Sequence, residues 1–362
     1  MATLFQQIIN GLSLGSVYAL IAVGYSLVYS ILSFSNFAHG GFLVVGGYIC
    51  YGMLAGFDLV LGGQHIIGLQ PFPSAAASFP STSVPVSLDF IVWGQHLFSI
   101  PSSIWIGGIC ALIGAGLIAI LTERLAYKPI RERTSTTLYL LIASMGVSIV
   151  IENIFVIVVG GRFRALPSGT FDDIFDIFER ISRFCGTIES TGGNASAHLI
   201  NLGAGVTVSM FDILSLIVAV LFLGGLQLFL TRTRWGLAIR AAACDLNTAG
   251  LMGVNVARLI SIVFFVAGLL AAIGGIFLSF RYTLYPQLGG TITTKAFVAA
   301  VIGGLGSLPG AVVGSLILGL AEMLTAGFIS SQMRDLVVFS MLVIMLLIKP
   351  AGFFGRQISD KI

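Results

Sequence analysis

Long apolar stretches separated by shorter polar segments run through the whole chain. Several are roughly 18 to 25 residues long, the length that a helix needs to cross about 30 Å of hydrocarbon. The alternating segments of about 10 residues that are typical of a membrane β-barrel are absent from the sequence. The pattern therefore predicts an all-α, polytopic integral membrane protein of about eight transmembrane helices, with some broken or half-length segments.

The predicted spans are distributed along the whole chain, so we predict a single transmembrane domain over residues 1–362. They are residues 8–31, 40–57, 103–121, 136–159, 211–230, 259–280, 312–328 and 336–348, and the apolar stretch 296–304 is only half as long as a span needs to be. Composition agrees with this prediction, because 57% hydrophobic and 9% charged residues provide too little polar surface for a soluble protein.

The positions of Lys and Arg predict the orientation of these spans. The first basic residue is Arg124, and the short segment 124–133 holds four of them, which marks it as cytoplasmic. Alternation then places residues 58–102 and 161–210 outside, and residues 231–258 and the C-terminal tail inside. The same alternation puts the N-terminus outside, but its short uncharged tail leaves the side open. The positive residues behind the net charge of +3 therefore reflect the orientation in the membrane, and the net charge gives no support for nucleic-acid binding.

The inner segment 231–258 is unusually long and basic for a membrane loop. Residues 235–244 consist largely of helix formers, Asp245 can cap a second short helix that runs toward Met252, and Gly253 can end it. Two short helices in a basic loop form a compact docking surface for a motor protein, with Leu251 and Met252 as an apolar knob. The residues predicted to couple the chain to such a motor are Arg240, Asp245, Asn247, Leu251, Met252, Gly253 and Asn255.

Sequence motifs of catalysis are missing. The chain has no GxxxxGK[ST] segment for ATP phosphates, no HExxH and no CxxC, and its four histidines are scattered. We therefore predict no catalytic residues, no metal site and no cofactor in this chain, so any ATP and Mg²⁺ belong to partner subunits. An integral membrane enzyme is disfavoured for the same reason.

Two Gly-rich interruptions of the apolar pattern, residues 33–41 and 303–311, suggest an internal repeat. In transporters with such repeats, broken helices expose polar groups to a central path. Ser35, Asn36 and His39 are candidates for that path on this interpretation. The alternative is that either stretch is only a tight turn between helices. Elsewhere, Gly11 and Gly15 have the spacing that lets two membrane helices approach closely.

Ionised residues inside apolar segments are costly unless they are paired or in contact with water. Glu152 and Glu322 are the two intramembrane acids. They either line a water-filled path, where they could meet the ammonium group of a zwitterionic substrate, or hydrogen-bond to neighbouring helices or to a partner subunit. We expect Glu123 and Asp212, near span ends, to be solvated. The bases Arg281 and Lys295 are expected at the outer interface with their side chains extended toward water.

An amphipathic helix is predicted for residues 171–184 in the second external segment, since apolar and acidic residues alternate there at helical spacing. Its polar face could dock a soluble binding protein, or the helix could simply lie on the bilayer or under neighbouring loops. The candidate docking residues are Asp172, Asp173, Asp176 and Arg180.

Three long segments resemble one known family. They are GLSLGSVYALIAVGYSLVYSILSFSNFAHGGF at 11–42, AIRAAACDLNTAGLMGVN at 238–255 and FVAAVIGGLGSLPGAVVGSLILGLAE at 297–322. The chain is similar to the permease subunits of high-affinity branched-chain amino acid ABC importers, most of all to the LivH type. The similarity extends over about three quarters of the chain, whereas residues 58–102 and 161–210 look longer than the usual loops.

The resemblance implies a multi-pass protein of the bacterial inner membrane. Its implied partners are a second related permease, two cytoplasmic ABC ATPases, a periplasmic substrate-binding protein and the lipid bilayer. Two alternatives remain from the sequence: a urea or short-amide permease of the same family, and a secondary transporter that uses an ion gradient with Glu152 and Glu322 as ion ligands.

Overall fold

The computed structural model describes residues 2–55, 58–61, 64–68, 104–133, 136–164, 199–201 and 207–355. Its helices in chain order are α1 (Ala2–Leu32), α2 (His39–Ala55), α4 (Ile104–Thr122), the π-helix η1 (Glu123–Tyr127), α5 (Lys128–Arg133), α6 (Thr137–Val159), α8 (Met210–Arg232), α9 (Arg234–Cys244), α10 (Leu246–Leu251), α11 (Val256–Arg281), α12 (Leu288–Gly303), α13 (Leu308–Phe328), the 3₁₀ turn η2 (Ser331–Met333) and α14 (Arg334–Ile348). Two small antiparallel pairs, β1 (Asp58–Leu61) with β2 (Gln64–Gly68) and β3 (Leu199–Asn201) with β4 (Thr207–Ser209), accompany the helices.

The structure confirms the all-α membrane architecture. In the described part of the chain, seven helices are long and apolar enough to cross a membrane, and α12 is a shorter apolar helix of 16 residues. The predicted span 40–57 corresponds to α2, which has 17 residues. The predicted half-length stretch 296–304 is the second half of α12, which begins earlier than its apolar run.

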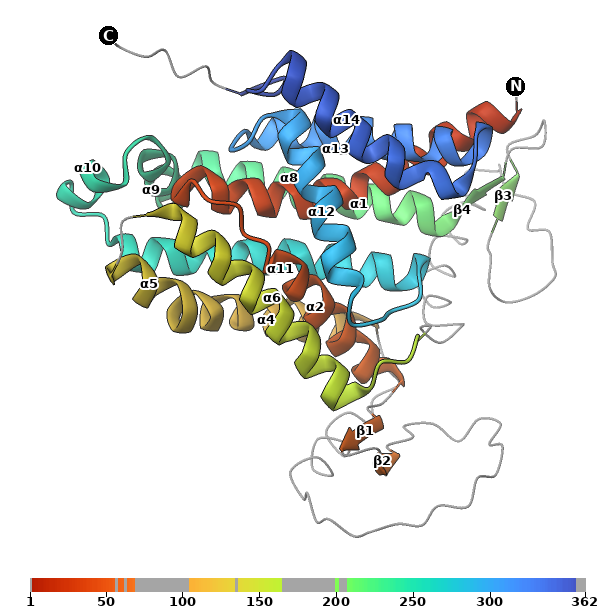
Figure 1. Cartoon of the computed structure of the whole chain (residues 1–362), viewed down its shortest axis with the longest axis horizontal. Coiled ribbons are helices and arrows are strands. Elements are labelled where there is room, and N and C mark those ends of the chain that lie inside the picture. Colours follow the sequence, from red (N-terminus) through yellow and green to blue (C-terminus); the bar gives the residue numbers. More distant parts are fainter. Residues whose placement is uncertain are drawn as a thin grey trace.

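Two helices, α1 and α11, form the centre of the bundle (Figure 1). Burial reaches 94% in the most apolar window of α1 and 72% in that of α11, whereas the same measure is 22% for α6 and 11% for α14. Close packing on α1 depends on glycine, as the sequence predicted. A Cβ added to Gly319 of α13 would collide with the backbone of Gly15, and one added to Gly11 would press against the backbone of Leu320.

Both α2 and α12 begin deep in the bundle and run to opposite ends. At the start of α2, His39 Nε2 lies 3.0 Å from the carbonyl oxygen of Ile21, which is in the middle of α1. Near the start of α12, Gly289 packs directly on the backbone of Gly40. From there α2 leads toward β1, whereas α12 ends beside the turn at Gly306, near the last residues of α1.

Packing partners reveal an internal correspondence between two groups of helices. In one group α1 packs on α13, and in the other α11 packs on α4; α2 packs on α4 and α6, and α12 packs on α13 and α14. Under this correspondence the connection 33–38, before α2, matches the connection 282–287, before α12. The sequence-based pairing of 33–41 with 303–311 was therefore wrong.

The segment 303–311 is the tight turn that the alternative interpretation allowed. Gly304 and Gly306 have φ values of +107° and +82°, which favour glycine, and the Ser307 hydroxyl accepts a hydrogen bond from the backbone N–H of Gly310 to begin α13. Gly304 and Gly306 thus reverse the chain, whereas Gly303 in α12 and Gly310 in α13 let the two helix backbones pack directly on each other.

The N-terminal end of α1 and the α9–α10 pair lie at opposite ends of the bundle (Figure 1). Ser13, in the first half of α1, donates a hydrogen bond to Asp212 at the start of α8, and α8 then runs to α9. If residues 231–258 are cytoplasmic, the start of α1 is therefore on the outer side, a question that the sequence left open.

This geometry makes a labelling prediction. Cys244 at the end of α9 is an exposed free thiol, and Gln332 lies in η2 at the opposite end. In a Cys185→Ser background, we expect a membrane-impermeant maleimide to label Gln332→Cys in intact cells and Cys244 only after permeabilisation. The parent Cys185→Ser protein is the control for the introduced thiol. Labelling of Cys244 in intact cells would contradict the orientation.

Candidate functional site

A cavity of about 270 Å³ lies near the bundle end opposite α9–α10, between α1, α12, α13, the start of α14 and the connection that precedes α12. We call it the tyrosine cavity, because Tyr18, Tyr282 and Tyr285 line it. Its volume is far above the roughly 10–15 Å³ that one water needs and just below the roughly 300–1,000 Å³ of typical small-molecule sites.

The polar wall of the tyrosine cavity is an ion-pair network. Lys295 Nζ lies 2.7 Å from Glu322 Oε1 and 3.1 Å from Asp335 Oδ1, and the Tyr18 hydroxyl donates to Glu322 Oε2 at 3.1 Å. The Glu322 side chain is 1% exposed and that of Lys295 17% exposed. Each buried charge thus has a partner of opposite sign, as the low-dielectric interior requires.

These contacts correct the prediction for Lys295 and bear on both alternatives for Glu322. Lys295 does not extend toward water at the outer interface, because its ammonium group is held between two carboxylates. For Glu322, the structure shows the hydrogen bonds to neighbouring helices that one interpretation expected. It also places this acid in the wall of a cavity.

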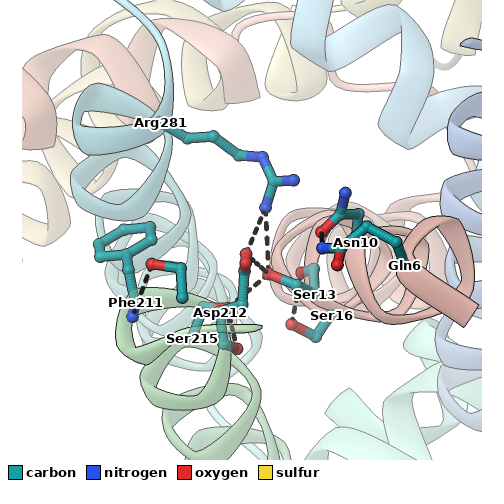
Figure 2. A network of polar contacts seen from close by, with 9 residues as sticks. Gln6, Asn10, Ser13, Ser16, Phe211, Asp212, Ser215 and Arg281 are labelled. Atoms are coloured by element: carbon teal, nitrogen blue, oxygen red, sulfur yellow. Dashed lines mark hydrogen bonds and ion pairs between the residues drawn. The ribbon is translucent and has the colours of Figure 1, made fainter. Parts of the chain in front are cut away.

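A second network joins α1, α8 and α11 (Figure 2). Arg281 Nη1 lies 2.8 Å from Asp212 Oδ1 and 3.1 Å from Ser13 Oγ, and Ser13 Oγ is also within 3.0 Å of Ser215 Oγ. The side chains of Arg281 and Asp212 are 19% and 12% exposed. The predictions that Asp212 is solvated and that Arg281 extends into the interface were therefore wrong, because the two residues neutralise each other inside the bundle.

The candidate path residues of the 33–41 segment are held by the α4–α6 side of the bundle. The Asn36 Oδ1 atom accepts hydrogen bonds from the Tyr127 hydroxyl at 2.8 Å and from the backbone N–H of Ala38 at 3.2 Å. Ser144 of α6 donates to the carbonyl oxygen of Ser35. Asn36 and His39 are both buried, so this connection is fixed by side chains of other helices.

The other two candidate path residues lie apart from each other. Glu152 of α6 accepts a hydrogen bond from Ser148 at 3.3 Å, and its Oε1 atom approaches the first turn of α12 at Gly290. Glu322 belongs to the tyrosine cavity instead. The five predicted path residues therefore divide between the starts of α2 and α12 and the cavity, and do not form one cluster.

The expectation for Glu123 was also wrong. Its side chain is 1% exposed and accepts a hydrogen bond from Ser261 of α11 at 3.0 Å, while Arg131 Nη2 lies 3.4 Å from its other oxygen. Glu123 is the first residue of the π-helix η1, in the middle of the apolar helix that continues into α5. It thus connects this helix to α11 rather than facing water.

The structure confirms the predicted helix, cap and stop in residues 231–258. Thr233 caps α9, and Asp245 caps α10 by accepting hydrogen bonds from the backbone N–H groups of Asn247 at 2.9 Å and Thr248 at 3.3 Å. Gly253 follows α10 with a φ of +89°. The Thr248 hydroxyl and these backbone donors hold the pKa of Asp245 below its usual range, so the cap stays ionised at neutral pH.

The proposed contact residues of this loop are accessible. Leu251 and Met252 are 88% and 82% exposed, and Arg240 and Asn247 are also exposed. Asn255 accepts a hydrogen bond from the backbone N–H of Arg258 and so begins α11. Two large apolar side chains at the tip of a capped helix form the knob that the sequence predicted.

The predicted docking helix 171–184, with Asp172, Asp173, Asp176 and Arg180, lies outside the described residues. Most of the two external segments, 58–102 and 161–210, does so as well. The docking role of the helix 171–184 stays a prediction.

Sequence reasoning missed the members of the tyrosine cavity other than Glu322. One signal was present: Lys295 lies in an apolar segment and needs an acid nearby, and Glu322 is the acid in the next apolar segment. The contribution of Tyr18 had no such signal, because nothing in the order of the residues brings the first and last parts of the chain together.

A comparison with known families settles what kind of protein this architecture belongs to. The family described as "Branched-chain amino acid transport system / permease component" matches residues 7–346. The chain belongs to this family. The permease is 32% identical to the high-affinity branched-chain amino acid transport system permease protein LivH of Escherichia coli, over 99% of this chain and 97% of that protein.

Other relatives agree. The permease is 34% identical to the high-affinity branched-chain amino acid transport system permease protein BraD of Pseudomonas aeruginosa, over 99% of this chain and 97% of that protein. It is 24% identical, over 94% of its length, to a probable branched-chain amino acid transport permease protein LivH of Methanocaldococcus jannaschii. No solved structure matches the chain. The family and the apolar helices together make this a multi-pass membrane protein with a transport role.

Proposed function

We propose that this permease is a membrane subunit of an ATP-binding-cassette importer for branched-chain amino acids. The observation that supports this most is the family match over residues 7–346, together with relatives of that name that align with nearly the whole chain. A urea or short-amide permease is less well supported, because LivH and BraD, which are more than 30% identical to this permease over nearly its whole length, are named for branched-chain amino acids.

The energy for transport comes from other subunits in this proposal. The sequence lacks a phosphate-binding loop, so ATP and Mg²⁺ are bound by two cytoplasmic ATPases. Their contact is the exposed knob of Leu251 and Met252 at the end of α10. Since α9 packs on α1, α8 and α11, a displacement of the loop is passed directly to the centre of the bundle. A secondary transporter would have no need for such a loop.

The remaining partners follow from the same assignment. A second, related permease would complete the transport path, and a periplasmic binding protein would deliver the substrate to the bundle end opposite α9–α10. The poorly buried helices α6, α8 and α14 would face the lipid of the bacterial inner membrane or the second permease. No part of the reaction is covalent, and this chain acts by binding and conformational change.

The proposal predicts ATP-dependent uptake that depends on the α10 turn. In proteoliposomes with the complete complex and its loaded binding protein, we expect uptake of [¹⁴C]leucine with ATP inside and none without it. Gly253→Val should lower this uptake at least tenfold while the permease still inserts. At a φ of +89° a β-branched residue is strained by about 1–3 kcal/mol, although no atom lies within 4 Å of the added Cβ.

Gly250→Ala is the matched control for this loop. Its Cβ would meet Val256 at an ordinary contact distance of 3.5 Å, and the position lies inside α10, so uptake should stay near the wild-type level. Leucine uptake driven by an ion gradient without ATP would refute the ABC assignment. ATP-dependent uptake of urea in place of leucine would refute the substrate. Wild-type uptake by Gly253→Val with ATPases still bound would remove the coupling role of this turn.

A further inference from the structure

We propose that the tyrosine cavity is a substrate site within the permease, which holds a zwitterionic, aliphatic amino acid after the binding protein releases it. This inference rests on the proposed function and adds to it a place in the chain where the amino acid is recognised. The argument uses the charges, the shape and the position of the cavity.

The charges around the cavity suit a molecule with one positive and one negative group. Two bases, Lys295 and Arg334, and two acids, Glu322 and Asp335, line it, so their formal charges cancel. Glu322 is 1% exposed and Asp335 is 69% exposed, so the cavity has a buried end and an end that faces water. At the buried end, a ligand with a net charge would leave that charge unbalanced in a medium of low dielectric constant, whereas a zwitterion would not. Each of its charged groups would find a partner of opposite sign on the wall.

One donor of the cavity wall lacks an acceptor. Arg334 Nε is buried and has no hydrogen-bond partner among the described residues. A buried guanidinium donor without an acceptor costs free energy, and a carboxylate is the acceptor that guanidinium groups pair with best. The α-carboxylate of an amino acid would supply it, with Lys295 next to it. Its α-ammonium group would then lie against Glu322 and Asp335, which already accept from a lysine ammonium.

The apolar part of the wall suits a short branched side chain. Leu288 and Ile292, both 4% exposed, line the cavity from one face of α12, beside the rings of Tyr282 and Tyr285. Removing a short aliphatic side chain from water against these residues favours binding, because apolar surface is then buried. The volume of about 270 Å³ accommodates an amino acid.

The position of the cavity also fits. Its wall includes Arg334 and Asp335 at the start of α14. This end of α14 lies away from α9–α10 (Figure 1), on the side where a binding protein would release its ligand. Tyr282 and Tyr285 belong to the connection that turns back into the bundle before α12, and Lys295 is on α12 itself. A bound amino acid would therefore contact α12, a helix that starts in the interior of the bundle.

The test separates binding from a purely structural ion pair. Each of the single variants Lys295→Met and Glu322→Gln removes one partner of the ion pair. Each single variant should lower [¹⁴C]leucine uptake at least tenfold. The double variant Lys295→Met with Glu322→Gln leaves neither of these two side chains charged. A structural pair predicts that the double variant recovers wild-type uptake. The site predicts that its uptake stays at least tenfold low while the permease still co-purifies with its ATPases.

A direct measurement complements this test. The wild-type complex in nanodiscs, without the binding protein, should bind [³H]leucine saturably, in competition with isoleucine and valine. Leucinamide, which lacks the carboxylate, and 4-methyl-2-oxopentanoate, which lacks the ammonium group, should compete at least tenfold less well. The double variant should bind no leucine. Absence of saturable binding to the wild type, or full competition by both analogues, would overturn the site.

The control is Thr294→Val, one residue before Lys295 on α12 and outside the cavity wall. Its hydroxyl donates only to a carbonyl oxygen of its own helix, that of Gly290, so uptake and leucine binding should match the wild type. A failure of the cavity assignment can be distinguished from a failure of the proposed function. If wild-type complexes import no leucine, the function is wrong. If they do and the double variant imports equally well, only the cavity assignment is wrong.

Discussion

Replacing Gly40 with alanine is expected to stop transport, although the change adds one methyl group. A Cβ at this position would overlap the Thr293 hydroxyl oxygen and the backbone carbonyl of Gly289. Backbone atoms cannot turn aside as a flexible side chain does, so α2 and α12 would have to separate where both begin. Over-packing of this kind costs about 1–3 kcal/mol, and we expect leucine uptake to fall at least tenfold.

Gly146→Ala provides the control for Gly40→Ala. Gly146 lies within α6, and no atom would come within 4 Å of its added Cβ. Alanine forms helix more readily than glycine, so this variant should be as stable as the wild type or slightly more so. Measurements of uptake and of the thermal unfolding midpoint in detergent compare the two. Equal uptake by Gly40→Ala and the wild type would show that the contact between α2 and α12 tolerates expansion.

The second large effect is expected at Arg281. Arg281→Met leaves the carboxylate of Asp212 inside the bundle without its cation, a change that typically costs about 3–5 kcal/mol in a buried pair. We therefore expect a lower unfolding midpoint and less protein in the membrane. The double variant Arg281→Met with Asp212→Asn should recover most of the loss, because no charge is left unpaired.

The surface pair Lys128 and Glu132 offers a matched comparison for Arg281. These groups are 3.9 Å apart and 44% and 64% exposed, so Lys128→Met should cost at most about 1 kcal/mol. The same thermal unfolding assay applies to all three variants. If Arg281→Met unfolds at the same temperature as Lys128→Met, the interaction in Figure 2 contributes no more than a surface pair.

Features that depend on neighbouring residues could be predicted from the sequence. The lengths of the apolar runs gave the spans, because burying backbone polar groups in lipid permits little besides helices. The cap at Asp245 and the stop at Gly253 were predicted because both act within a few residues of chain. The glycine contacts of α1 followed from spacing alone, although their partner helix did not.

Features that depend on pairs of residues far apart in the sequence could not be predicted from it. A charged residue near the end of an apolar run looks solvated from the sequence, and Asp212 and Glu123 were interpreted in this way. Each is instead neutralised or hydrogen-bonded by a side chain that enters from another helix, Arg281 in one case and Ser261 in the other. The repeat was assigned to the wrong second segment for a similar reason. Residues 303–311 share their glycines with 33–41, but the correspondence is defined by which helices pack together.

The central position of α1 also bears on how the protein is made. This helix leaves the ribosome well before two of the helices that enclose it, because α11 and α13 begin only at Val256 and Leu308. During synthesis its glycine face has no partner, and lipid must cover a surface that ends up in contact with protein alone. Membrane helices that insert singly and associate afterwards follow this order. A chain cut short before Val256 would keep α8 as a partner of α1 but lack α11 and α13, and we therefore expect membrane quality-control proteases to degrade it.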